Sequence, residues 1–197
     1  MNPLNNHRHS LILGFVLALV LAIALTGGVE FNGPAMARWL HIVAGVFWIG
    51  LLYYFNAVQV PGLAEAAADK GGPGGAGITK YVAPRALFWF RWSALLTWLA
   101  GAWLLGPRFV PAFTLGAGTG DKSTLIIGIG VWLGTIMLFN VWGLIWPNQK
   151  KILGIKPATD EEKAKARKVA LYASRTNFVL SIPMLMCMAA TSHGLGL

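Results

Sequence analysis

The sequence predicts an all-α integral membrane protein with five transmembrane helices. Of the 197 residues, 56% are apolar and only 12% are charged, whereas a soluble domain usually carries about 25% charged residues. The mean hydropathy is +0.60. A helix needs about 20 apolar residues to cross the hydrocarbon core of a bilayer. Five stretches approach or reach that length: 11–29, 38–60, 87–106, 123–146 and 177–193.

The first two stretches have clear limits. Residues 11–29 carry no charge. The segment Ala22-Ile23-Ala24 resembles the cleavage site of a signal peptide, but the apolar run continues past it, and this favours a retained helix. Residues 38–60 are rich in aromatic side chains and lie between Pro34 and Pro61, where prolines are expected to limit a helix.

The other three stretches are also helical in character. Residues 87–106 contain one charge, Arg91, and residues 123–146 contain none. Residues 177–193 form the shortest stretch and include Pro183. A membrane helix tolerates such a proline when neighbouring groups satisfy the freed carbonyl.

The distribution of cations predicts the orientation. With the N-terminus inside, 13 of the 16 Lys and Arg residues fall on the cytoplasmic side, as the positive-inside rule requires. The C-terminus is then outside. We expect 1–197 to form a single membrane domain, with a Gly-rich mobile connector at 62–80.

Residues 159–174 combine a capping box, formed by Thr159 and Glu162, with a run of basic side chains. They predict a short amphipathic cytoplasmic helix. It would either lie on the inner surface, attracted to anionic lipid, or be a solvated helix in a loop.

Composition also excludes several kinds of site. All seven acidic residues lie outside the apolar stretches, so carboxylate proton relays inside the bilayer are not expected. The single cysteine, Cys187, excludes an internal disulfide, a zinc site built on a Cys pair and covalently attached haem c. The net charge of +9 lies mainly next to apolar spans. Membrane lipid is therefore the expected partner, and nucleic acid is not.

Two histidines are expected at the outer ends of their helices. His41 lies in the first turn of one helix and His193 at the end of another. Gly45, one turn from His41, leaves room for a flat macrocycle, and Arg38 could pair with a propionate. The pair therefore suggests a haem b site with both imidazoles on the iron.

Two other interpretations of these outer residues stay open. An interfacial histidine can simply form a hydrogen bond to a carbonyl or a lipid headgroup. Met184, Cys187 and Met188 share a helical face, and soft sulfur ligands suit Cu(I).

A second polar set lies toward the inner side. It consists of Arg91, Asn140, Arg175 and Asn177. Arginine and amide groups together could bind a planar anionic heterocycle as substrate. Alternatively, Arg91 could snorkel to the interface and the amides could hold helices together.

Several motifs resemble one family as a set. They are Arg38-Trp39-Leu40-His41 with Gly45-Val46-Phe47-Trp48-Ile49-Gly50, Pro84-Arg85-Ala86-Leu87 with Phe90-Arg91-Trp92-Ser93, Asn140-Val141-Trp142-Gly143-Leu144-Ile145-Trp146-Pro147-Asn148-Gln149-Lys150, Ala173-Ser174-Arg175-Thr176-Asn177, Ser181-Ile182-Pro183-Met184 and Ser192-His193. Together they resemble the membrane domain of bacterial membrane-bound urate hydroxylases, called the urate oxidase N-terminal domain. The resemblance covers about residues 36–194.

This resemblance implies a multi-pass protein of the bacterial cytoplasmic (inner) membrane that oxidises urate or a similar heterocycle. In the family a cytochrome c domain typically follows on the outer side, whereas this chain ends at Leu197 without a CxxCH motif. We therefore expect electrons to leave through a separate cytochrome c or another redox subunit. The catalytic residues cannot be placed by motif. The alternatives are a haem-carrying electron-transfer subunit, or a structural subunit without cofactor, in a larger membrane respiratory or oxidase complex.

Overall fold

The computed structural model describes residues 2–28 and 31–194, and every regular element among them is helical. Contacts between residues divide the chain into two compact units, Met1–Ala35 and Met36–Leu197. Each unit is considered by itself below.

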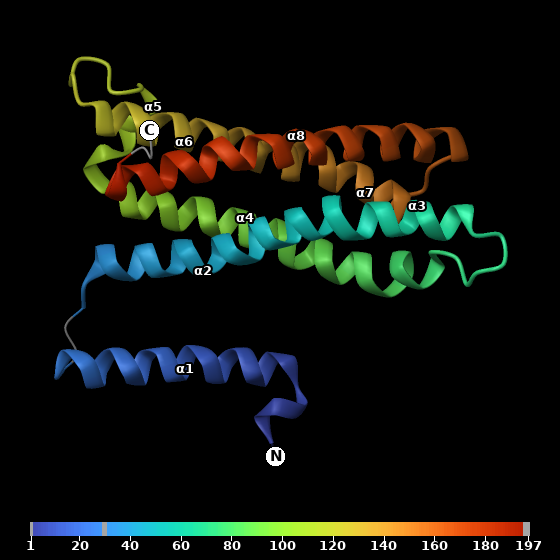
Figure 1. Cartoon of the computed structure of the whole chain (residues 1–197), viewed down its shortest axis with the longest axis horizontal. Coiled ribbons are helices and arrows are strands. Elements are labelled where there is room, and N and C mark those ends of the chain that lie inside the picture. The colour runs from blue at the N-terminus through green and yellow to red at the C-terminus, as the bar shows by residue number, and fades with distance from the viewer. Residues whose placement is uncertain (1, 29–30, 195–197) are drawn as a thin grey trace. The chain divides into compact units, whose positions relative to one another are not determined.

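The first unit contains a 3-10 turn, η1 (Pro3–Asn5), and the helix α1 (His7–Thr26) (Figure 1). The side chain of Asn6 caps α1 by accepting a hydrogen bond from the Arg8 amide at 2.9 Å. Gly27 ends the helix in the left-handed conformation, with φ of 72°. None of the α1 side chains is buried within the structure, and the helix is long and apolar enough to cross a membrane.

The second unit is a bundle of long helices (Figure 1). Two of its long segments are interrupted by π-helical stretches, which insert an extra residue without ending the helix, and a third π-helical stretch begins another long segment. In chain order the elements are α2 (Gly33–Tyr54), η2 (Phe55–Gln59), α3 (Val60–Ala68), η3 (Ile78–Val82), α4 (Ala83–Leu105), η4 (Gly106–Arg108), α5 (Phe109–Phe113), α6 (Lys122–Phe139), η5 (Asn140–Ile145), α7 (Trp146–Ile152) and α8 (Asp160–His193).

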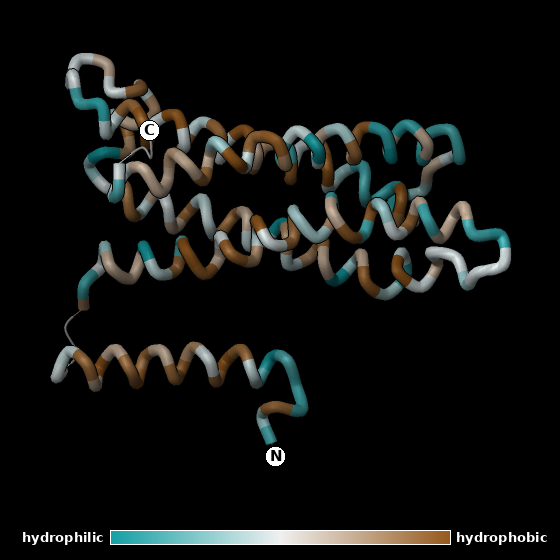
Figure 2. Tube along the Cα trace, viewed as in Figure 1, coloured by the Kyte–Doolittle hydropathy of each residue, from teal (hydrophilic) through white to brown (hydrophobic). Residues whose placement is uncertain are grey.

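Among the described residues, three segments are long and apolar enough to span a membrane: His7–Thr26, Gly33–Ala68 and Lys122–Ile152. The all-helical class is confirmed, because every regular element of the described residues is a helix. Five spans and their orientation stay a prediction. Figure 2 shows that polar residues gather toward the end of the bundle that holds the α3–α4 connection, while apolar residues dominate further along.

The prediction of a separate amphipathic helix at 159–174 was wrong. The capping box is present, because the Thr159 hydroxyl accepts from the Glu162 amide at 3.2 Å and the Glu162 carboxylate accepts from the Thr159 amide at 2.9 Å. However, the helix that starts there continues unbroken for 34 residues to His193. One buried face, with Ala166, Ala170 and Asn177, runs through both halves of α8.

The Gly-rich connector is also shorter than 62–80. α3 extends to Ala68 and η3 begins at Ile78, so only residues 69–77 lie between these helical segments. The helices therefore project well past the predicted ends of their apolar stretches. The 36 residues of Gly33–Ala68 correspond to about 54 Å of helix, against about 30 Å of hydrocarbon core.

Candidate functional site

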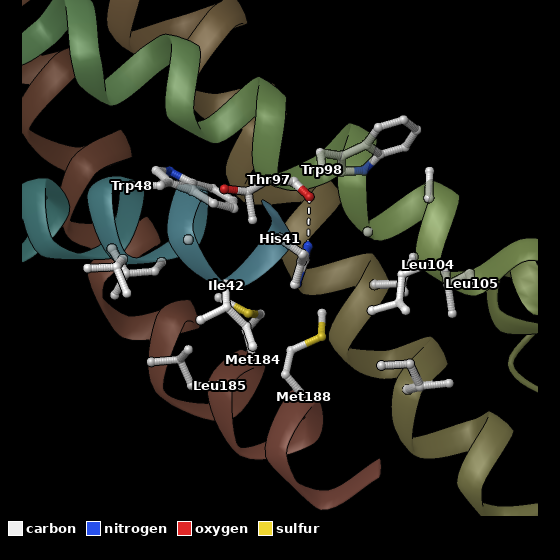
Figure 3. Close-up of a pocket in the computed structure, with 18 of the residues that line it drawn as sticks. His41, Ile42, Trp48, Thr97, Trp98, Leu104, Leu105, Met184, Leu185 and Met188 are labelled. Atoms are coloured by element: carbon white, nitrogen blue, oxygen red, sulfur yellow. Dashed lines mark hydrogen bonds between the residues drawn. The ribbon is translucent and has the colours of Figure 1, made fainter. Parts of the chain in front are cut away.

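A cavity of about 430 Å³ lies in one half of the second unit (Figure 3). Its volume falls in the range of small-molecule and cofactor sites, roughly 300–1,000 Å³. Side chains from α2, α4, α5, α6 and α8 line it, and almost all of the lining is apolar. His41 is the ionisable side chain among the lining residues, so it dominates the chemistry of this cavity.

The orientation of His41 is fixed by α4. Nδ1 of the imidazole lies 2.8 Å from the carbonyl oxygen of Thr97 (Figure 3). A carbonyl can only accept, so Nδ1 carries the hydrogen and donates it, and the neutral ring has its lone pair on Nε2. This is the arrangement in which a backbone carbonyl orients a metal-binding histidine.

Glycines give this imidazole its space. A Cβ added at Gly101 would lie 2.9 Å from Cε1 and Nδ1 of His41, so this position in α4 packs directly against the ring. A Cβ at Gly45 would only touch the Thr97 methyl group at 3.7 Å. At Gly50 and Gly134, which also line the cavity, a Cβ would meet nothing within 4 Å. The walls therefore leave room for a flat group.

The cavity opens to the surface of the bundle on the side of α2 and α8. Ile42 and Val46 on α2 line it, yet are 56% and 67% exposed, and Leu185 on α8 is 42% exposed. These exposed side chains are all apolar, as expected of a surface in contact with lipid.

The short helix α5 closes one end of the cavity with Phe109 and Phe113. Gly128 on α6 lets α5 approach, because a Cβ there would collide with the backbone oxygen of Ala112. The indole of Trp132 on α6 donates to the Phe113 carbonyl at 3.0 Å. The close approach at Gly128 and the hydrogen bond from Trp132 thus both hold α5 against α6.

The loop that follows α5 ends at the N-cap of α6. The Asp121 carboxylate accepts from the Thr124 hydroxyl at 2.6 Å and from the Ser123 amide at 3.0 Å, and it lies 3.7 Å from Arg108. These hydrogen bonds, the one from the Thr124 hydroxyl first, hold the pKa of Asp121 below its usual value. These contacts of Asp121 fix the end of the loop at the start of α6.

The four outer residues predicted for the cofactor occupy different surroundings. His41 and Gly45 line the cavity. Arg38 is exposed on α2, one turn before His41. His193 is exposed at the last turn of α8 and is absent from the cavity lining. The structure therefore does not bring His193 into the same cavity as His41.

The inner set is dispersed, apart from its two amides. Asn140 donates to Asn177 at 2.8 Å, and Asn177 donates to the Met137 carbonyl at 2.9 Å. The guanidinium carbon of Arg91 lies 3.9 Å from the centre of the Trp146 ring, as in a cation–π contact. Arg175 is exposed. The two amides join η5 to α8, and the cavity around His41 includes none of the four residues.

Sequence reasoning did not identify the residues on α4 that hold His41. Thr97 and Gly101 are separated from it by more than 50 positions, and neither belongs to a recognisable motif. Met184 and Met188 were noted as soft ligands, and both line the cavity. Cys187, grouped with them by helical spacing, is buried and is not among the lining residues.

The described residues thus define an all-helical protein with helices of membrane-spanning length and an apolar cavity with one imidazole in its wall. Residues 112–196 match the family model described as urate oxidase N-terminal, and over this part of the chain the match agrees with the resemblance that the motifs indicated. The match covers α6, α7 and α8, whereas His41 lies before it. No curated protein and no solved structure matches the chain.

Proposed function

We propose that this chain is a membrane redox protein of the urate hydroxylase type that binds haem b through His41. It passes electrons to a separate cytochrome or oxidase partner. The observation that carries the proposal is the imidazole itself: Nδ1 is engaged by the Thr97 carbonyl, and Nε2 keeps its lone pair within a cavity of about 430 Å³.

The cavity suits a porphyrin in shape and polarity. Its lining is apolar, as the faces of a macrocycle require, and Gly45, Gly50 and Gly134 leave flat wall surfaces. Arg38, one turn from His41 and exposed, is placed to pair with a propionate at the rim. A bound haem would supply one-electron transfer, and the chain would contribute the His41 nitrogen that holds it, the orientation of that ring through Thr97, and the exclusion of water.

The proposal includes five spans with the N-terminus inside and the C-terminus outside. α4 and the apolar half of α8 then cross the bilayer in addition to the three segments that meet the length and hydropathy requirements. In this orientation the cavity lies in the outer half of the membrane. An electron acceptor on the outer side is therefore the nearest one.

A difference spectrum of the reduced and oxidised protein, purified in detergent, tests haem binding. We expect a six-coordinate b-type spectrum for the wild type and its loss in His41→Ala. His9→Ala, a matched change in an exposed histidine of α1, should leave the spectrum unchanged. Circular dichroism and gel filtration establish that each variant is folded. A folded His41→Ala protein with the wild-type spectrum would refute ligation by His41.

A second candidate is an electron-transfer subunit without a substrate site of its own. It is favoured by the hydrogen bond between Asn140 and Asn177, because these amides satisfy one another rather than facing a common cavity. Anaerobic addition of urate separates the two candidates. Reduction of the haem by urate would support the oxidoreductase, and reduction only by a quinol or another donor would support the electron-transfer subunit.

A further inference from the structure

We infer that Met188 on α8, rather than His193, is the second axial ligand of the haem held by His41. This inference rests on the proposed function and adds one specific residue to it. A thioether is a recognised partner of histidine on haem iron.

Two methionines of α8 line the cavity that contains His41. Met184 and Met188 both line it, together with His41. Figure 3 shows both thioether groups on the side of the imidazole that faces away from Thr97. This is the side on which a group bound to Nε2 would lie, because Nδ1 is directed at the Thr97 carbonyl.

Helical geometry directs His193 elsewhere. It follows Met184 by nine residues, which is about two and a half turns of an α-helix, so the two side chains leave α8 on opposite faces. The structure agrees, because Met184 is 5% exposed while His193 is exposed.

The level of Met188 along the bundle also matches His41. The helix that begins with α2 runs antiparallel to α8 (Figure 1), and Asn56 donates to the Ser174 hydroxyl at 2.9 Å. His41 lies fifteen residues before Asn56. The residue fifteen positions after Ser174 is Ala189, next to Met188. Met184 lies a turn further toward the inner end and is itself buried in the apolar core with Leu52 and Met137, whereas Met188 is only partly buried and packs against that core.

Met188→Leu is the direct test, since leucine keeps the volume and removes the sulfur. Full-length protein is purified with its haem, and the spectrum and midpoint potential are measured. We expect Met188→Leu to retain haem on His41, to lose the methionine-to-iron charge-transfer band and to become high-spin. Met186→Leu, the matched change at an exposed methionine of α8 that does not line the cavity, and His193→Ala should keep the wild-type spectrum.

Met188→His provides a second measurement that does not depend on a lost ligand. In contrast to Met188→Leu, this variant should give a six-coordinate, low-spin spectrum. Its midpoint potential should be lower than that of the wild type, because methionine ligation raises the potential. Loss of the low-spin spectrum in His193→Ala, with Met188→Leu unchanged, would overturn the inference and leave haem binding intact. A wild-type protein without haem would overturn the proposed function as well. Stoichiometric Cu(I) bound by that colourless protein would likewise overturn both.

Discussion

At the scale of single residues, the position of one imidazole depends on one missing methyl group. A Cβ at residue 101 would lie 2.9 Å from two atoms of the His41 ring, so the ring would have to leave the Thr97 carbonyl. Changes in groups that orient a metal ligand commonly weaken metal binding by about 10- to 100-fold.

We therefore expect Gly101→Ala to weaken haem binding by about 10- to 100-fold, measured by titrating the apoprotein with haemin. Gly62→Ala is the matched control, because Gly62 lies on α3 outside the cavity lining and its Cβ would meet nothing within 4 Å. Equal affinities for the two variants would show that the contact with Gly101 does not position His41.

The buried amides make a structural prediction. Asn177 is 0% exposed and connects α8 to the carbonyl of Met137 and to Asn140. Removing one partner of a buried hydrogen bond costs about 1–3 kcal/mol. Asn177→Ala should lower the free energy of unfolding by this amount.

Asn140→Ala should be less costly in the Asn177→Ala background than in the wild type, because the two side chains share a bond. Unfolding in mixed detergent measures all four proteins. If the variants keep wild-type stability but lose a response to urate, the amides belong to a substrate site instead.

At the scale of elements, the sequence predicted where helices lie better than where they end. Uninterrupted apolar runs indicated each long segment. The continuation of α8 through residues 174–177 was not predictable from hydropathy, because the charged part of the helix ends there while its buried face continues. The same limit applies to the site. His41 and Gly45 share one helix, so their spacing alone places them on one face, whereas Thr97 and Gly101 require the register between two helices.

The continuity of α8 predicts a distance. Spin labels at Glu161 and Met186, in a Cys187→Ala background, lie on one face because 25 residues correspond to about seven turns. We expect a separation of about 38 Å from the rise of 1.5 Å per residue, measured by pulsed electron paramagnetic resonance. A right-angle bend near Arg175, with the first half on the membrane surface, would shorten it to about 27 Å.

The start of α8 predicts a dependence on pH. The hydrogen bond from the Thr159 amide, followed by the charge of Lys151, lowers the pKa of Glu162. A carboxylate whose pKa is lowered by folding stabilises the folded state above its unfolded pKa, and this contribution is lost as the pH falls through the folded value.

The thermal midpoint of the wild type should therefore fall more steeply on acidification than that of Glu162→Gln. Glu161→Gln is the matched control, since Glu161 lies outside the capping box, and it should follow the wild type. Parallel curves for wild type and Glu162→Gln would show that the capping box contributes nothing at neutral pH.

At the scale of the whole molecule, charge defines the two ends of the second unit. The connection at 69–77 and the start of α8 lie at the end rich in cations, whereas the 115–121 loop lies at the opposite end (Figure 1). The positive-inside rule assigns the cation-rich end to the cytoplasm.

Single cysteines in a Cys187→Ala background test this orientation. In intact cells, a membrane-impermeant maleimide should label Ala117→Cys but not Ala76→Cys or Lys156→Cys, and all three should react after permeabilisation. Labelling of Ala76→Cys in intact cells would reverse the orientation and place the His41 cavity in the inner half of the membrane.

The central claim concerns what the His41 cavity holds. The most direct measurement is the ratio of haem to protein, from the pyridine haemochrome spectrum of the full chain purified from its native membrane. We expect about one haem b per chain and its loss in His41→Ala but not in His9→Ala. A folded, intact wild-type protein without haem would contradict the account.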